Sequence, residues 1–286
     1  MARARLALLL VLIPLIAACQ VVRTGPAVAP AAEVRDTHEL LDGVLWMETA
    51  AEYEMLTRIA YAQARQDLDL GLADTSWTAA LEQAGAYSSL PTAVILDVDE
   101  TVLDNSRFEG RLILDRSDYN ESVWQDWVRQ RAATVVPGAD DFLKYAVSKG
   151  VTVFYVTNRN ARQEDDTRAN LASAGLPVGT DRDVVLTRYE NGWSSSDKSA
   201  RRSHVCESYR VLLLVGDDLG DFVSGAKDTP ENRTKLARQY GTYWGSKWIL
   251  LPNPLYGSWE SALYGYGSKL SGKDILQKKL AQVRGF

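Results

Sequence analysis

Acidic side chains gather at two places in the sequence, each directly after an apolar run. They are Asp97 and Asp99 at the first place, and Asp217, Asp218 and Asp221 at the second. Carboxylates that converge on one crevice repel one another, so such a cluster requires a divalent cation to neutralise it. Carboxylate oxygens are hard ligands and favour magnesium. If the fold brings the two groups together, the sequence predicts a Mg²⁺ site.

Other polar side chains accompany these acids. They are Thr157, Asn158 and Arg159, which follow a further apolar run, and Lys198, which precedes the last one. Each has a simpler explanation when taken alone, because a threonine can cap a helix and a lysine can be a surface charge. Their joint occurrence, each at the end of an apolar run or at the start of the following helix, favours a catalytic site instead.

Three continuous apolar runs indicate the elements that would position these residues. The runs occupy residues 92–96, 151–156 and 211–215. Continuous apolar runs are typical of strands that are covered on both faces. Helical stretches fall at residues 139–148, 162–174 and 197–208. This alternation predicts an α/β fold with a doubly wound parallel sheet, in which ligands bind beyond the carboxyl ends of the strands.

Further helices are expected outside this core. Apolar positions from 38 to 70 recur at helical spacing, which predicts one long or two short amphipathic helices. Another helical segment is expected near 77–86. The α/β core would then span about residues 91–255, with a smaller, mainly helical subdomain built from residues 37–90 and the C-terminus.

The first residues have the organisation of a bacterial export signal. Two arginines precede an apolar stretch at 6–16, and residues 16–19 resemble a lipobox that ends in Cys19. The stretch is shorter than the ~20 residues that span a bilayer. We therefore expect a lipoprotein signal peptide at 1–18 and a lipid anchor on Cys19.

The residues after the expected lipid anchor predict where the protein is located. Residues 19–36 would form a tether, and residues 37–286 the folded domain. Gln20 stands where an aspartate would resemble an inner-membrane retention signal. This favours the outer membrane of a bacterial cell envelope, outside the cytoplasm.

Composition and charge exclude several other classes of protein. The 286 residues are 46% apolar and 24% charged, which is too hydrophobic for a disordered chain. The net charge of −5 disfavours binding to a nucleic-acid polymer. Two cysteines are too few for a disulfide scaffold or a four-cysteine zinc site. The sequence also contains no GxSxG elbow and no GxxxxGK[ST] phosphate loop.

The motifs around the two acidic groups resemble those of a known enzyme family. Residues 94–105 contain DxDET, and residues 211–222 contain GDDLGDF. Both are similar to the paired signatures of bacterial class C acid phosphatases, a branch of the haloacid dehalogenase superfamily that includes the surface lipoprotein e group. The resemblance extends to residues 153–159, Lys198 and residues 251–257. It implies a haloacid dehalogenase-like core and a hydrolase that acts on phosphoric monoesters.

Two residues depart from the family's pattern. Phe108 stands where the family usually has tyrosine, which removes a hydroxyl at a peripheral place. Asp218 stands where the family usually has asparagine or threonine. We expect Asp218 to add a carboxylate beside the metal, where it would tighten cation binding or change the preferred cation.

The resemblance implies that an aspartate attacks the phosphorus atom. Uncompensated, a phosphate dianion about 4 Å from a carboxylate is opposed by roughly 8 kcal/mol at an effective dielectric near 20. The compensating groups would be Mg²⁺ held by Asp97, Asp217 and the backbone carbonyl of Asp99, then Lys198 and the Thr157 hydroxyl. Asp97 would form an aspartyl phosphate, and Asp99 would give and then take a proton. Asp221 would hold metal-bound water or orient Lys198.

Aromatic residues indicate the organic part of the substrate. Trp124 and Trp127 follow the first strand in a region where this superfamily places lids, and Tyr256 follows a strand expected near Ile249. In family members such aromatic residues stack on nucleobases, which favours a nucleoside monophosphate. Asn158 and Arg159 are further candidates for substrate binding. The alternative is that the aromatic residues belong to the core or to a dimer interface, so a homodimer stays open.

The leading hypothesis is therefore a lipid-anchored, magnesium-dependent acid phosphatase for small phosphomonoesters, including 5′-nucleotides. A surface lipoprotein that binds a cation or a phosphate-bearing ligand without turnover would use the same crevice and stays open as the alternative. Phosphotransfer to acceptors other than water is a third hypothesis.

Overall fold

The computed structural model describes residues 37–267 and 269–285. The predicted signal peptide at 1–18, the lipidation site Cys19 and the tether at 19–36 lie outside these residues. Among the described residues, no helix combines the length and the apolar composition that crossing a bilayer requires. From Thr37 onward the chain forms one compact unit.

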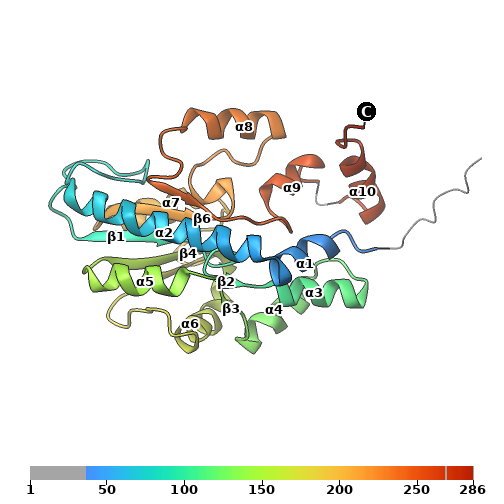
Figure 1. Ribbon diagram of the computed structural model, residues 1–286, viewed down its shortest axis with the longest axis horizontal. Coiled ribbons are helices and arrows are strands. Elements are labelled where there is room, and N and C mark those ends of the chain that lie inside the picture. Colours follow the sequence, from blue (N-terminus) through green and yellow to red (C-terminus); the bar gives the residue numbers. More distant parts are fainter. Residues whose placement is uncertain (1–36, 268, 286) are drawn as a thin grey trace, which may run out of the picture. The chain divides into compact units, whose positions relative to one another are not determined.

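A parallel sheet of five strands lies at the centre of the described part of the chain (Figure 1). In spatial order the strands are β5 (Val185–Arg188), β4 (Thr152–Asn160), β1 (Thr92–Leu96), β6 (Arg210–Gly216) and β7 (Trp248–Leu250). Every residue of β6 is buried, as expected for a strand that is covered on both faces. The predicted α/β fold with a doubly wound parallel sheet is confirmed, and β1 has the predicted bounds.

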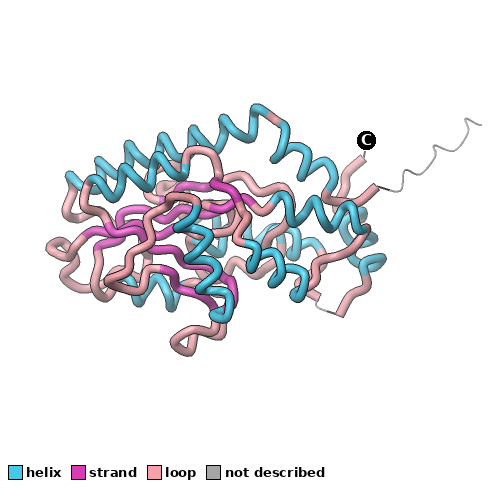
Figure 2. The backbone as a smooth tube through the Cα atoms, turned by 90° about the horizontal axis from the view of Figure 1, so that it is seen from below, coloured by secondary structure: helices cyan, strands magenta, loops and turns pink. Residues whose placement is uncertain are grey.

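Helices pack against both faces of this sheet, and Figure 2 shows the strands between them. The helices that contact the strands are α2 (Ala51–Ala73), α5 (Ala139–Ser148), α6 (Glu164–Ser173) and α7 (Ser199–Cys206). α2 and α5 lie side by side in front of the sheet in Figure 1. α5 has the predicted bounds. The predicted helix at 162–174 instead begins with a 3₁₀ turn, Ala161–Gln163, which leads into α6.

The predicted helical region at 38–70 forms two helices. α1 spans Leu41–Thr49 and α2 begins at Ala51, because Ala50 between them has an extended backbone with ψ 127°. The structure therefore selects the alternative of two separate helices.

The helix predicted near 77–86 is absent, and that prediction was wrong. The Ala79 backbone N–H donates to the Val211 carbonyl at 2.8 Å. The Trp77 indole N–H donates to the Leu212 carbonyl at 2.8 Å, and the Trp248 indole N–H donates to the Ala79 carbonyl at 2.9 Å. The polar groups of this segment therefore form hydrogen bonds with β6 and β7. In a helix, the backbone groups would instead bond to one another within the segment.

The remaining helices build the smaller subdomain and the C-terminal part. They are α3 (Ser106–Asp115), α4 (Glu121–Gln130), α8 (Pro230–Gln239), α9 (Ser258–Leu263) and α10 (Gly272–Leu280). A two-stranded antiparallel ladder of β2 (Leu103–Asp104) and β3 (Thr134–Val135) encloses α3 and α4 in the sequence. Apart from the main core, a second small apolar cluster joins α1 and α2 to Leu255. Of these helices, α3, α4 and α8 come from residues that the sequence assigned to the α/β core, whereas α2, from residues 37–90, packs on the sheet.

Candidate active site

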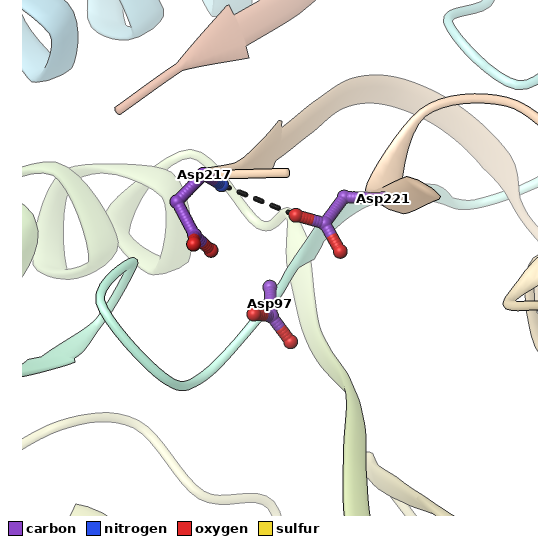
Figure 3. A group of neighbouring side chains, drawn as sticks. All are labelled: Asp97, Asp217 and Asp221. Carbon is purple, nitrogen blue, oxygen red and sulfur yellow. Dashed lines mark hydrogen bonds between the residues drawn. The ribbon is translucent and has the colours of Figure 1, made fainter. Parts of the chain in front are cut away.

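Three carboxylates meet beyond the carboxyl end of the sheet (Figure 3). Asp97 follows β1, and Asp217 and Asp221 follow β6. The two strands are adjacent and parallel, and the Asp97 N–H continues their ladder by donating to the Val215 carbonyl at 2.9 Å. One ligand oxygen from each of the three acids lies within 4.8 Å of those of the other two. The structure thus brings together three of the predicted metal ligands.

A tight turn fixes Asp221 against the end of β6. Its Oδ2 accepts from the backbone N–H groups of Asp217 at 3.1 Å and Asp218 at 2.9 Å, and Figure 3 draws the first of these bonds. A Cβ added at Gly216 would lie 2.3 Å from this oxygen. Only glycine therefore allows the carboxylate to approach the strand end so closely.

The ammonium of Lys198 brings a positive charge into direct contact with these carboxylates. Its ammonium contacts the Asp97 carboxylate and lies 2.7 Å from Asp221 Oδ1. The lysine side chain is 5% exposed and sits at the start of α7. Asp221 thus orients Lys198, which is one of the two roles predicted for it.

Charge in the cluster is unbalanced, because three carboxylates face one ammonium. Burial raises the pKa of Asp97 to about 7, although Lys198 acts in the opposite direction. Burial and the neighbouring carboxylates Asp221 and Asp97 raise the pKa of Asp217 well above its usual value. Ionising all three acids therefore requires additional positive charge. An all-oxygen donor set of this kind fits a divalent cation.

Asp99 faces a different set of groups from Asp97. Arg159 holds its carboxylate with a fork, in which Nη2 lies 2.7 Å and Nε 3.0 Å from Oδ1. Asn105 Nδ2 donates to the same oxygen at 2.9 Å. Arg159, predicted to bind substrate, is buried and uses its remaining donors on Thr167 and Asn105. Its contacts are those of a residue that positions Asp99.

Thr157 and Asn158 lie near the end of β4. Thr157 is fully buried, and its hydroxyl accepts from the Arg159 backbone N–H at 3.1 Å. Asn158 is exposed, and its Oδ1 accepts from Arg201 Nη2 at 2.7 Å. Arg201 is fully buried in α7 and also donates to the Thr157 carbonyl. Sequence reasoning missed Arg201, although it follows Lys198 by one helical turn.

Of the three aromatic candidates, Trp124 and Trp127 lie in α4, and Tyr256 lies in the loop before α9. The Trp124 ring packs edge to face on Phe108, with ring centroids 5.0 Å apart, and lies 5.3 Å from the Arg159 guanidinium carbon. Tyr256 is partly buried against the small apolar cluster. Asn253, which sequence reasoning missed, donates from Nδ2 to Asp217 Oδ2 at 2.8 Å. Asn253 thereby connects the loop that carries Tyr256 to the carboxylate cluster.

Asp218 is not one of the three acids whose oxygens converge, and its carboxylate is engaged by α9. Its Oδ2 accepts from the Ser258 backbone N–H at 2.7 Å, and its Oδ1 accepts from the Gly220 N–H at 2.8 Å. The Ser258 hydroxyl donates to both oxygens. These bonds tie the carboxylate to the first residue of α9. Phe108, the other departure, is buried.

Comparison with known proteins defines the family. A family model described as HAD superfamily, subfamily IIIB (Acid phosphatase), matches residues 37–259. The chain belongs to this family, which confirms the resemblance seen in its motifs. Its phosphatases cleave phosphoric monoesters, so the inferred enzyme class is that of the family.

Solved structures agree with this assignment, and curated relatives are also similar to part of the chain. The structure is similar to that of the class C acid phosphatase from Bacillus anthracis, with a TM-score of 0.76 and 32% identity over 86% of this chain and 97% of that chain. The class C acid phosphatase from Bacillus anthracis with tungstate bound gives a TM-score of 0.75, 31% identity and the same coverage. The stem 31 kDa glycoprotein of Glycine max is 24% identical over 163 residues, which are 57% of this chain and 58% of that protein. The chain spans somewhat more than half the length of these curated relatives.

Proposed function

We propose that this protein is a magnesium-dependent acid phosphatase that hydrolyses phosphomonoesters, including 5′-nucleotides, through a phosphorylated Asp97. The observation that carries the proposal is the position of the Asp97 carboxylate. It contacts the Lys198 ammonium and offers an oxygen within 4.8 Å of oxygens of Asp217 and Asp221, at the carboxyl end of the sheet. A nucleophile, a buried cation and ligands for a second cation therefore converge on one point.

Four residues of the chain have distinct roles in the two chemical steps of the reaction. An Asp97 oxygen attacks phosphorus as the bond from phosphorus to the ester oxygen breaks, and Asp99 gives its proton to the departing alkoxide. Asp99 then takes a proton from water, which attacks the phosphorus and breaks the bond to Asp97. Lys198 neutralises a phosphate oxygen in both steps. Asp221 holds Lys198 in place through the contact at 2.7 Å.

The carboxylate cluster supplies the ligands for Mg²⁺. Asp97 and Asp217 would hold the ion with the backbone carbonyl of Asp99, whose side chain is engaged by Arg159. When bound, Mg²⁺ supplies positive charge that lowers the repulsion between the phosphate dianion and Asp97. Asn253 keeps Asp217 in position through its bond at 2.8 Å.

Two features support a substrate with a phosphate and an aromatic base. A class C acid phosphatase of similar structure has been solved with tungstate bound, and tungstate is a tetrahedral oxyanion like phosphate. Tyr256 and Trp124 are both partly exposed, so each has ring surface that a nucleobase could cover. Asn158 is exposed at the end of β4 and could donate to the substrate from its amide nitrogen.

We further propose that the protein acts outside the cytoplasm, anchored by lipid at Cys19 to the outer membrane. The proposal rests on the lipobox and on Gln20 after it. It is tested by fractionating cells that express the protein or its Cys19→Ser variant. The parent protein is expected in the membrane fraction and the variant in the soluble fraction, and an unchanged distribution would contradict the anchor.

Hydrolysis of p-nitrophenyl phosphate tests the catalytic proposal. Purified protein is incubated with the ester and Mg²⁺, and a parallel sample contains excess EDTA. We expect nitrophenol release with Mg²⁺ and its loss with EDTA, because the carboxylate cluster is then uncompensated. A binding protein without turnover would release no nitrophenol in either sample. Rates over a panel of nucleotides and sugar phosphates would identify the preferred ester.

A further inference from the structure

Helix α4 reaches Asp99 through a hydrogen-bonded relay. The indole N–H of Trp127 donates to Asn105 Oδ1 at 2.8 Å, and Asn105 Nδ2 donates to Asp99 Oδ1 at 2.9 Å. Asn105 is fully buried, and its backbone N–H is bound by Glu100 Oε1 at 2.8 Å. The amide of Asn105 therefore has little freedom to turn, and the Trp127 bond defines which end faces Asp99.

A second route leads from the same helix to the same carboxylate. The Trp124 ring lies 5.3 Å from the guanidinium carbon of Arg159, within the range of a cation–π interaction. The Arg159 side chain is 1% exposed and forms the fork on Asp99. Trp124 and Trp127 are three positions apart in the sequence, so they project from neighbouring turns on one face of the helix.

We propose that α4 is a positioning element for the proton-transferring carboxylate, with Trp127 acting through Asn105 and Trp124 acting through Arg159. The inference rests on the proposed function, in which Asp99 protonates the departing oxygen. It gives these two tryptophans a role in the proton-transfer step. Val128 is the one buried residue of α4, and the helix also contacts α6.

The consequence of this arrangement depends on the leaving group. An alkoxide leaves poorly without a proton, whereas p-nitrophenolate is stable as an anion and needs little protonation. A small displacement of the acid therefore slows hydrolysis of an alkyl phosphate more than that of p-nitrophenyl phosphate. A purely structural defect slows both esters alike.

The test measures kcat/KM for p-nitrophenyl phosphate and for glycerol 2-phosphate, with Mg²⁺ present, in the parent protein and in Trp127→Phe. The ratio of the two values is expected to rise about tenfold in Trp127→Phe, because phenylalanine cannot donate to Asn105. Trp77→Phe is the matched control, since it loses an indole bond of the same 2.8 Å length to Leu212 in β6. Its ratio is expected to equal that of the parent.

Two more variants make every outcome decisive. Asp99→Asn is expected to raise the ratio by about a hundredfold or more, and adding Trp127→Phe to it is expected to change the ratio no further. A parent-like ratio in Asp99→Asn would remove the proposed role of Asp99, whereas a parent-like ratio in Trp127→Phe alone would overturn the present inference. If Trp127→Phe does not fold, Trp124→Leu replaces it, with an expected rise of about threefold from the weaker interaction.

Discussion

Asp97 and Asp99 are two residues apart, yet their surroundings differ in charge balance. Around Asp97 the described residues place three carboxylates against the single ammonium of Lys198. Around Asp99 one carboxylate meets one guanidinium, that of Arg159. In the first region the negative charge of three ionised acids would exceed the positive charge of the lysine, while in the second an arginine pairs directly with the acid. Two acids in the same turn after β1 thus have different surroundings: Asp97 belongs to a cluster of carboxylates, and Asp99 is fixed by an arginine.

This difference follows from the direction of the two side chains. Asp97 continues β1 and faces the end of β6, where Asp217 and Asp221 lie. Asp99 turns toward β4, whose carboxyl end carries Arg159. Because β1 lies between β4 and β6 in the sheet, the DxD spacing gives each acid a different neighbouring strand. The comparison predicts that substitutions affecting Asp97 and Asp99 change the kinetics of hydrolysis in different ways.

The largest effect is expected from Asp97→Asn. An amide is a poor nucleophile, so kcat/KM should fall by at least about four orders of magnitude for every ester, whatever its leaving group. The variant should also retain no labelled phosphate when the reaction with labelled substrate is quenched in acid. Substantial residual turnover, or a labelled variant, would remove Asp97 as the nucleophile.

A smaller and more selective loss is expected from Arg159→Lys, which removes the fork on Asp99. An ammonium cannot bind the carboxylate in the same two-point manner, so kcat/KM for an alkyl phosphate should fall by roughly a hundredfold. Arg131→Lys is the matched control, because Arg131 forms a similar fork on the surface residue Asp166, with Nη2 at 2.7 Å and Nε at 2.9 Å. Equal losses in the two variants would contradict a special role for Arg159.

The charge excess around Asp97 predicts how the metal-free protein responds to pH. Burial raises the pKa of Asp97 to about 7, whereas in the unfolded chain an aspartate titrates near 3.9. The folded state therefore binds the proton more tightly, and stability is lost as pH rises between these values. We expect the free energy of unfolding in EDTA to be about 2 kcal/mol lower at pH 7 than at pH 5.

Urea unfolding at the two pH values measures this difference. Asp97→Asn, which cannot ionise at this position, should show a weaker pH dependence, and Mg²⁺ should stabilise the parent at pH 7 by binding the folded state. Greater stability of the metal-free parent at pH 7 than at pH 5 would contradict the assigned charge imbalance.

The sequence was sufficient to predict the three central strands β1, β4 and β6 and the edge of the sheet where the acids meet, but not β5. Residues 92–96 and 211–215 are continuous apolar runs, and strands covered on both faces leave this pattern directly in the sequence. The helix predicted near 77–86 failed because its polar groups bind β6 and β7, which are more than a hundred residues away in the chain. Local pattern contains no information on such partners.

The same reason explains which site residues were missed. Asn105 and Asn253 lie inside segments that resemble the family, and Arg201 lies three positions after Lys198, but the local sequence does not show which predicted site residue each one binds. The direction of Asp218 is set by Ser258, which is 40 residues further on. Side-chain direction at a strand end depends on the loop that packs there, and the sequence motif does not contain that loop.

The smallest effect is expected from Asp218→Asn, which tests whether Asp218 contributes to the carboxylate cluster around Asp97. Asp217 and Asp218 are adjacent, but only Asp217 belongs to the carboxylate cluster. The amide oxygen of asparagine can still accept from Ser258 or Gly220, so kcat/KM should change by less than about threefold. The Mg²⁺ concentration that gives half-maximal activity should stay the same.

Asp217→Asn is the matched change one residue earlier, and it should raise that Mg²⁺ concentration by more than about tenfold. Titrating both variants with Mg²⁺ at a fixed concentration of p-nitrophenyl phosphate makes the measurement. If Asp218→Asn shifted the Mg²⁺ requirement as far as Asp217→Asn does, the Asp218 carboxylate would have to turn from Ser258 toward the ion. Charge at this strand end would then be shared by four acids, and the cluster would extend beyond the three that now meet there.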